Sequence, residues 1–220
     1  MTIIYLTRHS IPEKIKDLNN TLKQNKEIKL SEEGKKKAKE FFKKDEFKNI
    51  KRVYTSDYTR TKETGKILNE ITIDNRLGER IPGIPDTSLT PAEYYYKQIQ
   101  NKKFKFKNGE SREEIEKRMN DAIEEIINNN KNKEILVVTH GASMTFLLMK
   151  FCNIEMTNIE KKIRKIKFKN KIIFENKFDY LETFKLTFDE KNEIVDIVNV
   201  GGIYGNIWCK RKTRIHRRNC

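Results

Sequence analysis

The sequence has few cysteines and no long apolar run, and each absence excludes a class of protein. Three cysteines in 220 residues, Cys152, Cys209 and Cys220, are too few and too widely spaced for a disulfide framework or a zinc site. No apolar run approaches the roughly 20 residues that span a membrane. Met1 leads straight into an apolar run, without the basic region or cleavage pattern of a secretory signal. These absences favour a cytoplasmic protein with no membrane association.

Acidic residues are absent from the end of the chain, which carries six Lys or Arg after Gly201. Like-charge segments of this kind are usually disordered and sometimes contact polyanions. We therefore expect a catalytic domain over residues 1–200 and a basic tail over residues 201–220, with a nucleic-acid-binding or scaffold protein as an alternative function. The whole chain has a formal net charge of +15, and the part of this charge that lies outside the tail is diffuse, which is typical of a solvated surface.

Short apolar runs alternate with longer amphipathic stretches. The runs predict strands over residues 2–7, 53–55, 135–139, 180–188 and 194–198. The stretches predict helices that begin at Ser31, at about Tyr58 (extending to about Ile71), at Ser111 and at about Ala142. This alternation predicts an α/β fold of three layers, α/β/α, in which helices flank a mainly parallel sheet.

Three reactive side chains directly follow predicted strands: His9, Ser56 and His140. Ligands of such sheets bind beyond the carboxyl ends of the strands, so these positions share one edge. Arg8 precedes His9, and Arg60 lies one helical turn beyond Ser56. Because guanidinium groups grip phosphate oxygens bidentately, two arginines and two histidines at one crevice predict an anion site.

Six short motifs follow one another along the chain, and each is weak alone. They are residues 6–9 (Leu-Thr-Arg-His), 30–34, 56–64, 77–79, 109–111 and 137–141. In this order and at these distances they resemble the histidine phosphatase superfamily, also called the phosphoglycerate mutase-like family, from about Ile3 to Leu148. The resemblance implies the phosphoglycerate mutase-like fold and a phosphoric monoester hydrolase that acts on a small phosphorylated molecule.

The resemblance also assigns roles to five residues. His9 is the nucleophile, which forms a phosphohistidine that water then hydrolyses. Arg8, Arg60 and His140 hold the phosphate oxygens and offset charge in the transition state, so His140 is both catalytic and phosphate-binding. Glu79 protonates the leaving alkoxide. No metal or other cofactor is expected, because these cations replace it and no ligand cluster has metal spacing.

Glu79 is not the only candidate for the acid. The chain nearby also offers Glu70, Asp74, Glu93 and Glu110. The Leu-x-Glu context of residues 77–79 favours Glu79, whereas Glu110 is expected to order the start of a helix.

The chain departs from the family pattern after the nucleophile. Ser10 stands where the family usually has glycine, and it is expected either to donate a hydrogen bond to phosphate or to crowd the loop. The Thr and Asn that often follow are not recognisable. Residues 80–108 are shorter than the insert of the mutases and predict a compact lid with aromatic and Lys groups. A phosphatase is therefore favoured over phosphoglycerate mutase-type transfer, which stays the alternative. The sequence does not distinguish sugar phosphate, nucleotide and phosphoprotein substrates, and it predicts no oligomeric state.

Overall fold

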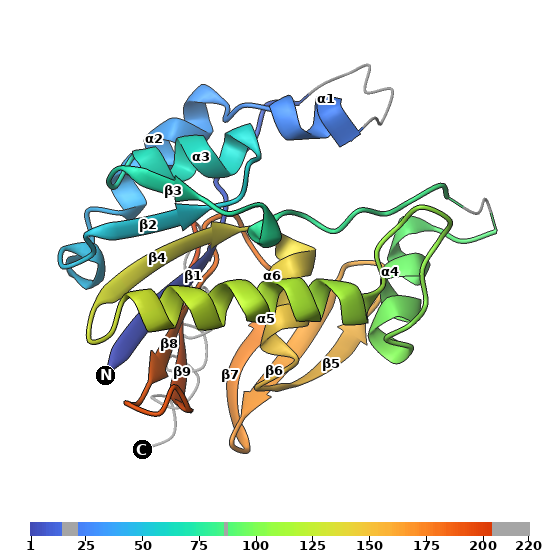
Figure 1. The fold of residues 1–220 in the computed structure, drawn as a ribbon. Helices are drawn as coiled ribbons and strands as arrows, with labels where there is room; N and C mark the ends of the chain where they lie inside the picture. The colour runs from blue at the N-terminus through green and yellow to red at the C-terminus, as the bar shows by residue number, and fades with distance from the viewer. Residues whose placement is uncertain (15–21, 86–87, 204–220) are drawn as a thin grey trace, which may run out of the picture.

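A six-stranded mixed sheet lies at the centre of the computed structural model, which describes residues 1–14, 22–85 and 88–203 (Figure 1). Its strands are β1 (Thr2–Arg8), β2 (Arg52–Thr55), β3 (Ile71–Ile73), β4 (Glu134–Thr139), β8 (Thr183–Phe188) and β9 (Ile194–Gly201). They lie in the order β3-β2-β4-β1-β8-β9. The first four strands are parallel to one another, whereas β8 is antiparallel to its neighbour β1, and β9, at the edge of the sheet, is antiparallel to β8.

Helices cover both faces of this sheet, as Figure 1 shows. They are α1 (Leu22–Glu27), α2 (Glu32–Phe41), α3 (Thr59–Lys66), α4 (Pro91–Gln100), α5 (Arg112–Asn129) and α6 (Gly141–Leu148), with short 3-10 turns η1 (Asp45–Phe47) and η2 (Asn75–Leu77). On β4, Leu136 and Val138 pack on the side of α2, while Ile135 and Val137 pack on the side of α5 and α6. Alternate residues of a strand point to opposite faces, so β4 is buried by helices on both sides. The predicted three-layer α/β fold is confirmed.

A second, three-stranded antiparallel sheet follows α6. It consists of β5 (Asn153–Asn158), β6 (Ile163–Phe168) and β7 (Lys171–Asn176), and its apolar residues join the core under α5 and α6. The sequence did not predict these strands. Charged residues interrupt their apolar positions, and the β6–β7 turn has no glycine: Lys169 and Asn170 adopt positive φ angles of 44° and 65° instead. Such a turn lacks the usual sequence signal of a hairpin.

Two predicted elements end elsewhere. The helix that begins near Tyr58 stops at Lys66, and Ile71 begins β3, because its β-branched neighbours pair with β2. The strand predicted from Tyr180 starts at Thr183, after Leu181 turns the chain at a φ of 56°.

The predicted boundary between domain and tail falls inside β9, which runs to Gly201. Residues 204–220, with the basic cluster and His216, lie outside the described residues, so the tail stays a prediction. None of the helices in the described part of the chain is long and apolar enough to cross a membrane.

Candidate active site

His9 and His140 lie side by side because β1 and β4 are neighbouring parallel strands. Arg8, the last residue of β1, pairs with Thr139, the last residue of β4. The backbone N–H of His9 donates to the Thr139 carbonyl at 3.0 Å, and the two imidazole centroids are 5.2 Å apart. The sheet register therefore brings the two histidines together at one strand edge.

Arg60 joins the two imidazoles. Its Nε donates to His9 Nε2 at 3.2 Å and its Nη2 to His140 Nδ1 at 3.3 Å. The guanidinium lies 4.6 Å from the Tyr58 ring centroid, and Nη1 donates to the carbonyl oxygen and Oδ1 of Asn25. Arg60 is only 5% exposed, yet none of these partners carries a negative charge. A buried cation held by neutral groups attracts an anion.

The hydrogen bonds fix the tautomer of each histidine. Because a guanidinium only donates, His9 Nε2 and His140 Nδ1 must accept. His9 Nδ1 then donates to the carbonyl of Ser10 at 2.7 Å, and His140 Nε2 donates to Ser56 Oγ at 2.9 Å. Both imidazoles are neutral in this arrangement, and the lone pair of His9 is on Nε2.

Electrostatics also keep the histidines neutral. Burial lowers the pKa of His9 well below its usual value, and the charges of Arg60 and Arg8 lower it further, against a smaller opposing effect of the Ser10 carbonyl. Burial likewise lowers the pKa of His140, followed by the effects of His9 and Arg60. A neutral imidazole is the form that attacks an electrophile.

Arg8 supplies a second cation at the mouth of the site. Its Nη1 donates to the carbonyl of Phe178 at 2.9 Å, and its guanidinium lies 4.3 Å from the Tyr180 ring centroid. Burial lowers the pKa of Arg8, while Tyr180 and Glu79 oppose that shift. Arg8 lines a cavity of about 460 Å³ together with Asn25, Glu79 and Gly141, and the two histidines and Arg60 lie buried beside it.

Glu79 faces the same cavity as Arg8. Its Oε1 accepts a hydrogen bond from the backbone N–H of Arg80 at 2.9 Å. Its negative charge raises the pKa of both Arg8 and Arg60 against the larger effect of burial, which places the carboxylate near both guanidinium groups. A proton donor at this position could reach an ester oxygen of a phosphate held between the arginines.

The other carboxylates weighed from the sequence serve elsewhere. Asp74 pairs with Arg76, and Glu110 pairs with Arg118. Glu93 completes a capping box at the start of α4, and Glu70 is exposed. None of these four acids lines the cavity beside Arg8.

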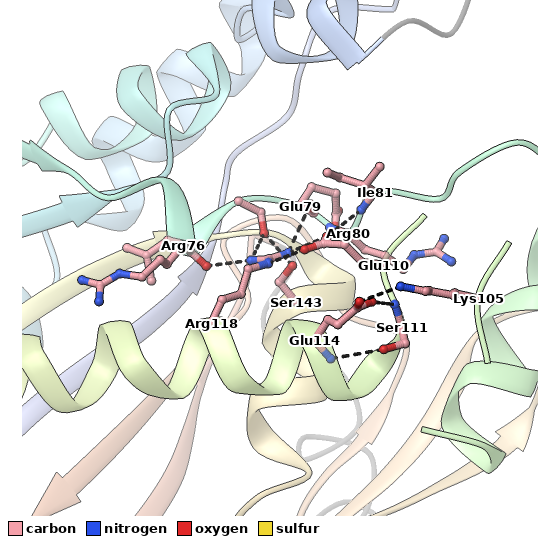
Figure 2. Close-up of polar contacts among 12 residues, drawn as sticks. Arg76, Glu79, Arg80, Ile81, Lys105, Glu110, Ser111, Glu114, Arg118 and Ser143 are labelled. Atoms are coloured by element: carbon pink, nitrogen blue, oxygen red, sulfur yellow. Dashed lines mark hydrogen bonds and ion pairs between the residues drawn. The ribbon is translucent and has the colours of Figure 1, made fainter. Parts of the chain in front are cut away.

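The backbone before Glu79 is held by Arg118, which projects from α5 (Figure 2). Arg118 Nη1 donates to the carbonyls of Arg76 at 2.6 Å and Gly78 at 3.0 Å, and Nη2 donates to that of Glu79 at 3.4 Å. One side chain thus holds three backbone carbonyls of the segment that presents the carboxylate.

Two further contacts tighten this segment. Glu110 accepts from Arg118 Nε at 2.7 Å and from the backbone N–H of Ile81 at 2.9 Å, and Ser143 Oγ donates to the Gly78 carbonyl at 2.7 Å (Figure 2). Glu110 thus helps to position the loop that carries Glu79. The start of α5 is capped by Ser111, which forms the expected capping box with Glu114.

Ser10 takes neither of the roles expected for it. Its Oγ donates to the carbonyl of Gly34 at 2.7 Å, and its backbone N–H donates to Thr64 Oγ1. The side chain is fully buried and anchors the loop after His9 to α2. Gly34 permits this contact, because a Cβ there would lie 2.1 Å from the Ile11 carbonyl oxygen.

Sequence reasoning missed Asn25 and Tyr180. Asn25 lies 16 residues after His9, on α1, and no motif spacing connects it to Arg60. Tyr180 comes from the other end of the chain, and nothing in its surroundings signals a contact with Arg8.

The profile of the histidine phosphatase superfamily (branch 1) matches residues 4–171. The chain belongs to this superfamily. The match confirms the predicted resemblance and the expected enzyme class, the phosphoric monoester hydrolases of the histidine phosphatase type. A comparison with proteins of curated function finds no match.

Solved structures of low sequence identity share the histidine phosphatase fold. Bacillus stearothermophilus YhfR is 20% identical, with a TM-score of 0.61 over 89% of this chain and 95% of its own. A phosphoserine phosphatase from Entamoeba histolytica, in complex with 3-phosphoglyceric acid, is 19% identical, with a TM-score of 0.58 over 89% of this chain and 94% of its own. A mycobacterial glucosyl-3-phosphoglycerate phosphatase is 16% identical, with a TM-score of 0.60 over 90% of this chain and 98% of its own.

The two buried histidines predict a pH-dependent stability. Because their folded-state pKa values are lowered, the unfolded chain binds protons below about pH 6.5 that the folded chain does not. The free energy of unfolding should fall as the pH decreases from about 6.5, by up to about 1.4 kcal/mol per pH unit for each histidine. When the free energy of unfolding is measured with urea at a series of pH values, it should depend less steeply on pH for His9→Gln than for the wild type. Equal slopes would contradict a neutral, buried His9.

Arg118 predicts a second effect on stability. Arg118→Met removes one donor from each of three backbone carbonyls and two donors from the Glu110 carboxylate, and we expect a loss of about 2–3 kcal/mol in the free energy of unfolding. The neighbouring Lys117, whose side chain is 76% exposed, offers a matched control: Lys117→Met should cost less than about 0.5 kcal/mol. Similar losses in the two variants would show that Arg118 does not hold the loop.

Proposed function

We propose that this chain is a phosphomonoester phosphatase that transfers the phosphoryl group to Nε2 of His9 and then to water. The observation that carries this proposal is the buried His9, whose Nε2 accepts a hydrogen bond from Arg60 and whose ring lies 5.2 Å from that of His140, with the charge of Arg8 also lowering its pKa. The named phosphatases of the same fold agree with this reaction class. The substrate is a small phosphorylated molecule.

Phosphate binding would use the donors that now meet at His9. Arg60 donates to His9 Nε2, and phosphate oxygens are stronger acceptors than an imidazole. When the phosphate oxygens accept the hydrogen bonds of the Arg60 guanidinium, Nε2 of His9 loses its hydrogen bond to Arg60 and can face phosphorus. Arg8 and His140 would hold the remaining equatorial oxygens, and a phosphate dianion would raise the pKa of His140 toward its charged form.

The first chemical step forms a bond from His9 Nε2 to phosphorus and breaks the bond to the ester oxygen. The leaving alkoxide takes a proton from Glu79. Phosphorylated His9 carries a positive charge on its ring, and its Nδ1–H already donates to the Ser10 carbonyl, which stabilises that charge. The contacts of His9 at this sheet edge would therefore favour both the attack on phosphorus and the charged phosphohistidine that follows.

The second step returns the enzyme to its starting state. Glu79, now a carboxylate, takes a proton from a water molecule as the water attacks phosphorus, and inorganic phosphate leaves. The positive charge that metal ions supply in other phosphatases would come here from Arg8 and Arg60. Cys152 is a buried core thiol, and burial raises its pKa to about 12.

The first functional prediction concerns His9. Wild-type protein should release phosphate from p-nitrophenyl phosphate in the presence of a chelator, and His9→Ala should lose at least about a thousandfold in kcat. Rapid acid-free denaturation during turnover should trap an acid-labile phosphoryl group in the wild type only. Equal rates in both proteins would refute the mechanism, and phosphoryl transfer to a second sugar acid without phosphate release would favour a mutase.

Glu79 predicts a dependence on the leaving group. Glu79→Gln should slow alkyl phosphates by about 100-fold or more but should slow p-nitrophenyl phosphate much less, because nitrophenolate leaves without a proton. Glu70→Gln, at an exposed position, is the matched control and should change neither rate. Equal losses on both substrates in Glu79→Gln would assign the proton transfer to another group.

A further inference from the structure

The cavity beside Arg8 extends past the phosphate-binding end to a wall of cations. Arg80 comes from the segment after Glu79, Lys162 and Arg164 from the turn between β5 and β6 and from β6 itself, and Lys177 from the residue after β7. These positions lie outside the six motifs, and three of them belong to the small sheet that the sequence did not predict. We refer to Arg80, Lys162 and Lys177 as the distal cations.

We propose that the distal cations bind a second anionic group, a carboxylate or a phosphate, on the same substrate molecule whose ester phosphate lies between Arg8 and Arg60. This inference rests on the proposed phosphatase function and narrows it to phosphomonoesters that carry a second negative charge. A guanidinium and two ammonium groups that line one cavity form such a site for either oxyanion.

The charges of this wall are not balanced by the protein. Within the described ranges, no ion pair involves a distal cation, although eleven such pairs occur elsewhere. Arg164, behind the wall, is 4% exposed, and its Nε has no hydrogen-bond partner there. The acids that line the cavity are Glu79, at the catalytic end, and Glu160. The cations therefore outnumber the acids.

Lys162 shows the cost of this crowding. Burial lowers its pKa, and the charges of Arg80, Arg164 and Lys177 lower it further, against a smaller opposing effect of Glu79. Its backbone has a φ of 54°, a left-handed conformation that favours Gly or Asn over Lys. A half-buried lysine in an unfavourable backbone conformation among like charges is consistent with an anion-binding role, because a bound anion offsets the repulsion.

Two of the distal cations, Arg80 and Lys162, contact aromatic side chains. Arg80 Nη1 donates to Gln98 Oε1 at 2.8 Å, and the guanidinium lies 4.7 Å from the Tyr94 ring centroid. The ring of Tyr95 lies 5.9 Å from both the Arg80 guanidinium and the Lys162 ammonium. Tyr95 is buried and therefore gives both cations a common packing surface. A cation that the protein already positions loses little side-chain entropy when it binds an anion.

The kinetic test compares substrates that differ only in the charge of the distant group. The probes are ω-phosphono-oxy carboxylates and α,ω-alkane bisphosphates with two to four methylenes, each matched to the ω-hydroxyalkyl phosphate of the same length. For the best length, wild-type protein should prefer the compound that carries the second anionic group by about tenfold or more in kcat/KM. The double variant Lys162→Gln/Lys177→Gln should reduce this ratio to about one.

The neighbouring Lys161 provides the matched control, because it is exposed and does not line the cavity. Lys161→Gln removes one positive charge near the same turn, so it tests general attraction by a basic surface. The preference for the substrate with the second anionic group over the matched hydroxyalkyl phosphate should stay at the wild-type value in this variant. A fall as large as in the double variant would overturn the inference, as would a wild-type ratio near one at every chain length.

A binding measurement tests this inference independently of the phosphatase proposal. Phosphonocarboxylates and matched alkylphosphonates are not hydrolysed, so calorimetric titration reports the distal cations even if no ester is turned over. The wild type should bind the phosphonocarboxylate at least about tenfold more tightly, and the double variant should lose that preference. Hydrolysis of all esters with no preference for the second anion, in rate or in affinity, would overturn the inference and leave the phosphatase intact. Tighter binding of the phosphonocarboxylate without hydrolysis of any ester would support the second anion site and overturn the phosphatase proposal.

Discussion

The contact of Arg60 with both imidazoles is the constraint on which the rest of the site depends. A guanidinium that is 5% exposed cannot lose its proton, so every group around it must accept or avoid a positive charge. His9 and His140 accept through ring nitrogens and are thereby held neutral, in opposite tautomers. Asn25 adds two oxygen acceptors and Tyr58 a ring face. The same interaction that keeps the two imidazoles neutral therefore leaves the site short of negative charge.

This constraint explains why the carboxylate must be placed from a distance. An acid in direct contact with Arg60 would neutralise the anion site and would hold its own proton too weakly to donate it. Glu79 instead lies at the cavity wall, where its charge is felt by Arg8 and Arg60 without an ion pair to either among the described contacts. Arg118, which projects from α5, holds the backbone before Glu79 through hydrogen bonds to the carbonyls of Arg76 and Gly78 (Figure 2). A helix distant from the chemistry thus sets the position of the acid.

The sequence predicted the parts of the site that follow from sheet topology and could not predict those that follow from packing. His9, Ser56 and His140 each leave a parallel strand, and the strand-edge rule was enough to bring them together. Asn25 reaches Arg60 from a short helix with no spacing rule, and Ser10 is fixed by Gly34 through a close backbone approach. The small sheet was missed because its turns use Lys and Asn at positive φ instead of glycine. Such contacts depend on tertiary structure, which local periodicity does not encode.

Net charge is a poor guide to where this protein binds anions. Lys and Arg number 47, but most lie on solvated faces, where water and salt screen them. Arg8 and Arg60 differ because burial lowers their pKa values, which means that the protein holds their charge at a cost in free energy. Lys162 shows the same sign of shift from burial and from neighbouring cations. On the proposed function, an anion held at both ends of the cavity would offset this cost, and selectivity would come from the few desolvated cations and not from the many exposed ones.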